Sequence, residues 1–99
     1  KHSPAMSDLV AKEEVEGLLK KLPEWEHEDK SIFRVFEFDD YMESIDFVNA
    51  VAEISEEGGH HPDMDIRWGL ITVRATTHEA GGLTEADFDV AKKIDTLLD

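Results

Sequence analysis

A chain of 99 residues can bury one hydrophobic core but not two, and with 40% hydrophobic residues it is too apolar for a disordered tail. Its 24 acidic residues against 10 basic ones give a formal net charge of −14, and so acidic a surface repels nucleic-acid phosphates and anionic lipid headgroups, which excludes both as direct partners. The absence of cysteine excludes disulfide and thiolate chemistry, and because we find neither a stretch of ~18 apolar residues nor a signal-peptide core we expect a soluble, cytoplasmic protein.

The N-terminal part of the chain predicts one helix. We interpret residues 1–6 as a cloning remnant or disordered start and residues 7–99 as a single domain. Apolar residues recur at helical spacing from Val15 to Leu22, and Pro23 stops the pattern. The spacing therefore predicts a helix over residues 8–22, capped by Ser7 or Asp8.

Residues 25–38 predict a hairpin. They are rich in β-branched and aromatic side chains, and the charged residues 28–30 interrupt them where a turn would lie. In the second strand Phe33 and Val35 point to one face, while Ile32, Phe36 and Phe38 point to the other. Both faces of the sheet are therefore expected to be covered, one of them by a partner subunit.

The C-terminal half predicts two helices around a second hairpin. After Asp39 or Asp40, which would cap the helix, apolar residues recur with the helical period to about Glu57. The predicted helix ends at the glycines 58–59. Residues 64–68 and 70–77 read as strands joined around Gly69. Thr84 followed by Asp87 resembles a capping box that opens the third helix. The inner side of that helix is expected to carry Phe88, Ala91, Ile94, Leu97 and Leu98.

The element order is therefore α-β-β-α-β-β-α. Hairpins make neighbouring strands antiparallel. The sequence thus predicts an α+β fold in which three helices pack on one face of a four-stranded antiparallel sheet.

Three of the five histidines stand where a site could form. His60 and His61 follow the glycines that end the second helix, and His78 follows the last strand. Strand alternation places His78 on the side of Thr72, Arg74 and Thr76 if the strand stays extended. We expect the three imidazoles to converge on one open patch, although a solvated loop is the alternative reading of His60 and His61.

Metal and nucleophilic chemistry fit the sequence less well. Three histidines with Asp63 and Asp65 nearby are the ligand types of a catalytic zinc site. Adjacent side chains usually diverge, however, and the spacing matches no HExxH helix, so we expect no metal. No serine lies in a strand-turn-helix elbow.

A larger set of residues resembles one family. The set comprises Glu56-Glu57-Gly58-Gly59-His60-His61-Pro62, Trp68, the run from Thr76 to Thr84, Asp87, and Ala91-Lys92-Lys93-Ile94-Asp95. This pattern resembles the pterin-4a-carbinolamine dehydratases, in which Glu, three residues and His-His-Pro precede an aromatic residue, a later His and an Asp. The likeness extends from about Leu9 to Leu98. One position departs from it, because Gly59 stands where the family often has Asp or Asn.

The resemblance implies an activity and roles for the histidines. The activity is loss of water from a 4a-hydroxytetrahydropterin, which gives the quinonoid dihydropterin and recycles the cofactor of aromatic amino acid hydroxylases. The resemblance implies that His60 and His78 perform acid/base work and that His61 holds the substrate. Glu56 would orient an imidazole or the pterin amide edge, unless it is a solvated last-turn glutamate. Imidazole suits such proton transfers because its unperturbed pKa of ~6.5 lies near working pH.

The same match suggests substrate contacts for six further residues: Trp25, Pro62, Trp68, Thr76, Thr77 and Asp87. Each has a simpler alternative that the residues alone do not exclude. The two tryptophans could stack on the flat pterin or pack in the core. The two threonines would offer backbone groups rather than hydroxyls, and Asp87 could serve only the capping box.

The resemblance also sets expectations about cofactors and partners. No cofactor or metal is expected, because the pterin is itself the substrate. Dimers or tetramers are expected, with a functional link to an aromatic amino acid hydroxylase. Some animal members of the family act as dimerisation partners of a transcription factor, so a non-catalytic interaction protein on the same fold is the alternative, as is a member whose pterin role has been diverted.

Overall fold

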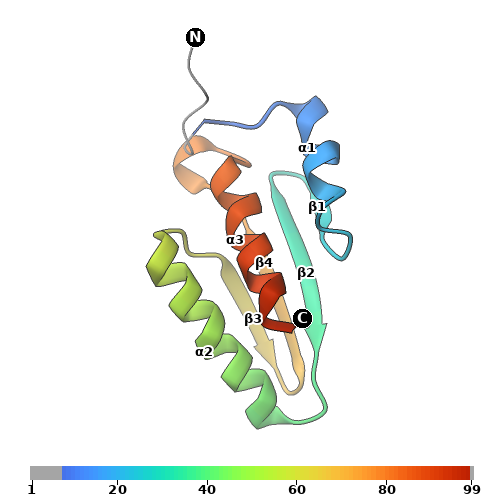
Figure 1. The fold of residues 1–99 in the computed structure, drawn as a ribbon, viewed down its shortest axis with the longest axis vertical. Coiled ribbons are helices and arrows are strands. Elements are labelled where there is room, and N and C mark those ends of the chain that lie inside the picture. Colours follow the sequence, from blue (N-terminus) through green and yellow to red (C-terminus); the bar gives the residue numbers. More distant parts are fainter. Residues whose placement is uncertain (1–7, 99) are drawn as a thin grey trace.

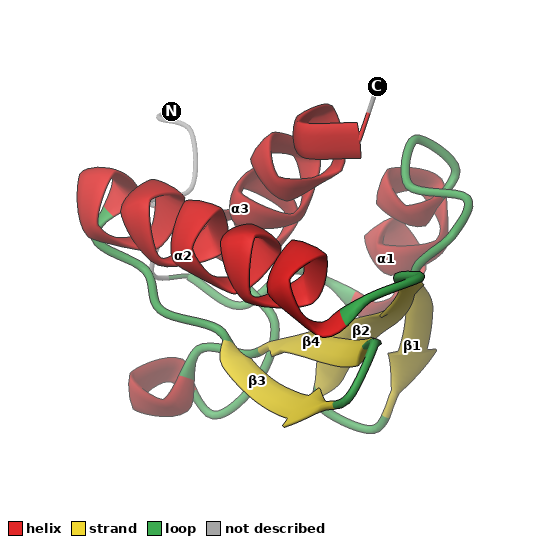
Figure 2. Ribbon diagram, turned by 90° about the horizontal axis from the view of Figure 1, so that it is seen from below, coloured by secondary structure: helices red, strands yellow, loops and turns green. Residues whose placement is uncertain are grey.

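The computed structural model describes residues 8–98, and the predicted division near residue 6 lies outside them. Three helices pack on one face of a four-stranded antiparallel sheet whose strand order is β1-β2-β4-β3 (Figure 1, Figure 2). The helices are α1 (Lys12–Leu19), α2 (Tyr41–Gly58) and α3 (Glu85–Asp95). The strands are β1 (Glu26–Glu28), β2 (Ser31–Glu37), β3 (Asp63–Arg67) and β4 (Leu70–Ala75). The predicted α+β order is confirmed, with two short 3-10 helices added, η1 (His78–Ala80) and η2 (Thr96–Leu98).

Two tight turns join the strands of the hairpins. Asp29, in the β1–β2 turn, has φ +56°, a conformation that Asp tolerates better than most residues. Gly69, in the β3–β4 turn, has φ +68°, and a Cβ there would lie 2.8 Å from the backbone oxygen of Phe38. Glycine is therefore required at this turn, which holds the hairpin against the end of β2.

The two faces of the sheet differ in their cover. On the helix side Ile32 and Phe36 of β2 and Ile71 of β4 are buried, as the alternation of residues predicts. On the other side Val35 and Leu70 are 45% and 37% exposed. No element formed by residues 8–98 covers that second face, which we call the open face.

The helix ends follow the predicted capping pattern. The Asp40 side chain accepts a hydrogen bond of 2.8 Å from the backbone N–H of Glu43 at the start of α2. Gly59, with φ +72°, ends the same helix in the left-handed conformation. At the start of α3 the Asp87 carboxylate accepts from the backbone N–H of Thr84, the reciprocal half of a capping box.

The predicted boundaries were wrong at both ends of α1 and at the end of α3. Helix α1 ends at Leu19 and not at residue 22, and its N-cap is Ala11 and not Ser7 or Asp8. Helix α1 begins at Lys12 and not at residue 8, because Leu9 forms a β-bridge with Thr84 and the Val10 N–H donates to the oxygen of Leu83. These two residues are extended, so they cannot join the helix. Leu97 and Leu98 do not extend the inner side of α3, because the chain tightens into η2 and leaves them 37% and 48% exposed. Between residues 8 and 98 no helix is both long enough and apolar enough to span a membrane.

Candidate functional site

Three chain segments meet at one end of the sheet. They are the link from α2 to β3, which carries His60 and His61, the end of β4 with η1, which carries Thr77 and His78, and the start of α3. Thr77 closes the η1 loop, because its N–H donates to the oxygen of Gly82 at 3.0 Å. The fold thus gathers residues that are distant in sequence.

Asp87 connects the three segments through one buried carboxylate. Its side chain has no exposed surface. Oδ1 accepts from Nε2 of His60 at 2.5 Å, while Oδ2 accepts from the Thr77 hydroxyl at 2.8 Å and from the Thr84 N–H at 2.9 Å. Because Thr77 donates its only hydroxyl proton to Asp87, the Thr84 hydroxyl is the donor in the 2.8 Å bond between the two threonines. We call Asp87, His60, Thr77 and Thr84 the Asp87 network.

The Asp87 network fixes the position of the His60 ring. Its side chain is 18% exposed, so the ring is held by protein on most sides and still reaches solvent. With Nε2 donating to a carboxylate, Nδ1 is the nitrogen left to exchange a proton with another group. Histidines that act as general acids or bases are commonly oriented by a carboxylate in this way.

His61 has a different partner and a wetter position. Its Nε2 donates to Oε2 of Glu56 at 2.7 Å, and the two side chains are 60% and 80% exposed. The pair places the imidazole beside the last turn of α2 without burying it. The expected contact between Glu56 and an imidazole is therefore present in the structure, while a contact of either residue with substrate stays a prediction.

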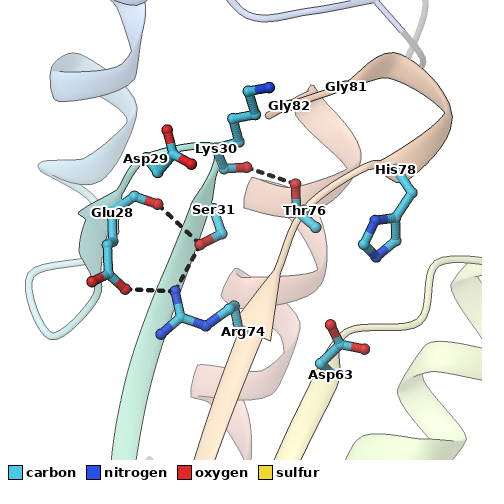
Figure 3. Close-up of a pocket in the computed structure, with 10 residues that line it drawn as sticks. All are labelled: Glu28, Asp29, Lys30, Ser31, Asp63, Arg74, Thr76, His78, Gly81 and Gly82. Carbon is cyan, nitrogen blue, oxygen red and sulfur yellow. Dashed lines mark hydrogen bonds and ion pairs between the residues drawn. The ribbon is translucent and has the colours of Figure 1, made fainter.

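His78 lines a groove of about 580 Å³ on the open face (Figure 3). Its imidazole is exposed and makes no hydrogen bond to any residue in the range 8–98, while its backbone oxygen accepts from the Gly81 N–H at 3.1 Å. Asp63, at the start of β3, lies on the same side of the groove, and Thr76 lies between them and the β1–β2 hairpin (Figure 3). As predicted, His78 therefore shares a face with Arg74 and Thr76, although β4 ends at Ala75.

The opposite wall of the groove is a small network around Arg74. Its Nη1 donates to Oε1 of Glu28 at 2.9 Å and to Oγ of Ser31 at 2.8 Å (Figure 3). The guanidinium also lies 4.6 Å from the centre of the Phe33 ring. The sequence placed Arg74 on the side of His78 but gave no reason to assign it to a site.

The imidazoles lie at one end of the sheet, but the expected single patch is divided. His60 lines a cavity of about 20 Å³ between α2 and α3, whereas His78 lines the groove. Within residues 8–98, no three His, Asp or Glu side chains are gathered closely enough to hold a metal ion. The residues described do not offer the ligand set that zinc would require.

The remaining predicted substrate contacts lie in varied places. Trp25 is 4% exposed in the core, where its indole N–H donates to Asp95 at 2.9 Å. Trp68 is 68% exposed in the β3–β4 turn. The length of β3, about 17 Å, separates it from Asp63, where the strand begins next to the histidine pair. The Thr76 hydroxyl donates to the oxygen of Lys30, so neither threonine hydroxyl is free, and Pro62 is half-buried beside His61.

The backbone conformation at Gly59 shows why glycine can stand where the family often has Asp or Asn. Its φ of +72° is the left-handed conformation that glycine adopts freely and that Asn and Asp tolerate best among other residues. No atom lies within 4 Å of where a Cβ would stand. An Asp or Asn side chain would therefore fit, and this chain lacks only the contacts it would make.

One feature of the site was not predicted, namely the pairing of His60 with Asp87. The two residues are 27 positions apart, and no local pattern reports such a contact. A signal was nevertheless available, because Asp87 precedes Ala91 and Ile94 by four and seven residues and so lies on the buried stripe of α3. A carboxylate on a buried stripe requires partners.

Comparison with known proteins decides the family. The family model described as Pterin 4 alpha carbinolamine dehydratase matches residues 8–97. The chain belongs to this family. Two relatives provisionally named as pterin-4-alpha-carbinolamine dehydratases, from Haloarcula marismortui and Acidobacterium capsulatum, are 46% and 47% identical to it. The alignments cover 95% and 94% of this chain and the whole of each relative.

Solved structures of pterin dehydratase relatives share the fold. A protein from Brucella melitensis described as a transcriptional coactivator/pterin dehydratase superposes with a TM-score of 0.86 at 27% identity, covering 91% of this chain and 98% of that one. A pterin dehydratase-like protein described as a RuBisCO assembly factor of the alpha-carboxysome gives a TM-score of 0.60 at 26% identity, covering 74% and 84%. The descriptions of these two proteins thus name roles other than dehydration.

Proposed function

We propose that this protein removes water from a 4a-hydroxytetrahydropterin and so returns the tetrahydropterin cofactor of an aromatic amino acid hydroxylase to its cycle. The observation that carries the proposal is the exposed His78 imidazole, free of protein partners among residues 8–98, in a groove of about 580 Å³. Family membership supplies the substrate class. His60, held by Asp87, and His61, held by Glu56, lie at the same end of the sheet and supply further proton-transfer and binding groups.

The reaction needs one proton given and one taken. A proton delivered to the 4a-oxygen lets the C4a–O bond break with water as the leaving group. The N5–H then loses its proton as the C4a=N5 double bond forms, and no electrons are gained or lost overall. His78 and His60 are our acid/base pair, because His78 has both ring nitrogens available and His60 keeps Nδ1 free while Asp87 holds Nε2.

His61 and Glu56 are assigned to substrate binding. Both are exposed, and their contact aims the imidazole from the end of α2. The groove itself supplies the remaining surface, and Thr76 borders it. In this proposal no cofactor or metal takes part.

Stopped-flow measurement of 4a-carbinolamine decay tests the activity. We expect the protein to accelerate the decay by about 10² or more without added metal, since one positioned acid or base contributes about 10²- to 10⁴-fold. The matched control is the double variant His60→Ala/His78→Ala. Acceleration abolished by a chelator and restored by zinc would contradict the metal-free mechanism, and no acceleration at all would contradict the activity.

We also propose that the protein self-associates as a homodimer or homotetramer. Val35 and Leu70 lie on the open face at 45% and 37% exposure, and Met42 on α2 is 65% exposed. Burying such apolar surface against a second copy is favourable. Light scattering at micromolar concentration is expected to give the mass of two or four chains, and the mass of one chain would contradict it.

A non-catalytic interaction protein is the second candidate. The descriptions of the two solved relatives, one a transcriptional coactivator/pterin dehydratase and the other a RuBisCO assembly factor, favour it. A protein of this kind would use a helical or open sheet face and would have no need of a free His78. The decay measurement separates the two candidates, because only the enzyme accelerates it.

A further inference from the structure

The groove extends well beyond His78. In the strand register Asp63 of β3 lies opposite Arg74 of β4, Arg74 opposite Phe33 of β2, and Phe33 opposite Glu26 of β1. Three strand spacings separate β3 from β1, which amounts to about 14 Å. Figure 3 shows His78 and Asp63 on one side of this hollow and Arg74 with Glu28 on the other. A pterin ring placed against His78 therefore leaves room for a substituent on the side of the groove formed by Arg74 and Glu28.

The Arg74 guanidinium is held in place before any ligand arrives. Two hydrogen bonds from Nη1, to Glu28 and Ser31, fix one side of the fork, and the Phe33 ring supports its flat face. Ser31 is itself anchored, because its hydroxyl donates to the backbone oxygen of Glu28 at 3.1 Å. Nε and Nη2 donate to no residue in the range 8–98, and the side chain is 37% exposed. Arg74 thus offers positioned donors whose ordering cost is already met.

The charges around the groove select the kind of acceptor. Glu28, Asp29 and Asp63 carry three negative charges, and Lys30 and Arg74 carry two positive ones. With the histidine neutral the lining is −1 overall, on a chain of formal charge −14. An anionic group would meet repulsion here, whereas a neutral hydroxyl accepts from Arg74 and donates to the Glu28 carboxylate.

The chemistry of the substrate brings a substituent to this wall. In the pterin ring C6 is bonded to N5, which is bonded to C4a, so a substituent at C6 leaves the ring close to the reacting carbon. With C4a at His78, such a substituent can follow the groove toward β2. We propose that Arg74 determines substrate specificity by binding the hydroxyl oxygens of a neutral polyhydroxyalkyl group at C6, an inference that rests on the proposed function.

Equilibrium binding of two stable probes tests the assignment. The probes are 7,8-dihydrobiopterin, which carries a dihydroxypropyl group at C6, and 6-methyl-7,8-dihydropterin, which carries no hydroxyl there. By calorimetry the wild type is expected to bind the first about fivefold or more tightly than the second, the yield of one or two hydrogen bonds to a charged donor. Arg74→Leu is expected to bring the ratio of the two Kd values to about one while changing the 6-methyl Kd less than about twofold.

A matched variant controls for loss of charge. Arg67→Leu removes another arginine from the same open face, paired with Asp65 at 3.2 Å at the far end of β3, and is expected to keep the wild-type ratio. Circular dichroism confirms that each variant is folded. Arg74→Lys is expected to recover part of the ratio, because lysine keeps the charge and loses the fork.

The outcomes separate this inference from the proposed function. A wild type without preference, a wild type that binds neither probe, or a ratio that Arg74→Leu leaves unchanged would each overturn the role of Arg74. The decay measurement on the same proteins reports the activity independently. If the protein accelerates the decay of pterins with either C6 group equally, the proposed function stands and the role of Arg74 does not. If the protein does not accelerate decay but Arg74→Leu abolishes its preference between the two probes, the role of Arg74 in binding stands and the proposed function does not.

Discussion

The His78→Ala variant is expected to lose at least about tenfold in kcat/KM for dehydration, and up to the 10²- to 10⁴-fold that one positioned acid or base contributes. The reason is that His78 is the free imidazole of the groove, and the other described residues that line it include no second histidine. Folding is expected to be unaffected, since the side chain is exposed and holds nothing else in place. Stopped-flow decay between about pH 6 and 8 measures the effect.

His60→Ala is expected to fall in the same range. The double variant should cost less than the product of the two single losses, because residues that act on one proton-transfer step are not additive. His61→Ala should act more through KM, as expected of a residue that holds the substrate. His27→Ala is the matched control, since its exposed imidazole lies in the β1–β2 hairpin and has a hydrogen bond to the backbone oxygen of Asp29. Wild-type rates in folded His60→Ala and His78→Ala variants would sink the acid/base assignment.

The Asp87→Ala variant is expected to lose about 2–4 kcal/mol of unfolding free energy. It leaves the Thr77 hydroxyl and the Thr84 N–H without their acceptor in a fully buried place, and each such loss costs about 1–3 kcal/mol. Removal of the reciprocal cap adds to the cost. Urea unfolding measures it, as a lower midpoint at an unchanged slope.

Neighbouring and conservative substitutions make this test specific. Asp89→Ala removes an exposed carboxylate two residues along α3, paired with Lys93 at 3.2 Å, and is expected to change stability by less than about 0.5 kcal/mol. Asp87→Asn should fall between, because it keeps one acceptor oxygen and replaces the other by donors. Equal stability of Asp87→Ala and Asp89→Ala would show that the Asp87 network contributes nothing to the fold.

Local rules predicted most of the fold. Apolar spacing located α2 and α3. The cap of α3 at Thr84 was predicted, and the caps of α2 at Asp40 and Gly59 were predicted to within one residue, because each cap depends on a residue and its immediate neighbours. The start of α1 was not, because Leu9 and Val10 are drawn into extended structure by a partner about 75 positions away. Sequence spacing carries no record of such a partner.

For the candidate site too, local features were predictable and contacts between distant residues were not. The histidines themselves were found from the sequence, but what each one contacts was found only from the structure. His60 with Asp87 and Arg74 with Glu28 are pairs separated by 27 and 46 positions. Strand alternation indicated that Arg74 and His78 share a face, yet only the register across β3, β4 and β2 shows that they border one groove.

The Asp87 network has a consequence for how this family can change over time. Asp87 caps α3 and orients His60 with the same carboxylate, so a substitution there damages the fold and the chemistry together. The His78 side chain makes no hydrogen bond within residues 8–98 and can be replaced at little cost in stability. We therefore expect a relative that keeps this fold but has lost dehydration to replace His78 early. The same relative is expected to retain Asp87 longest, because the fold still depends on it.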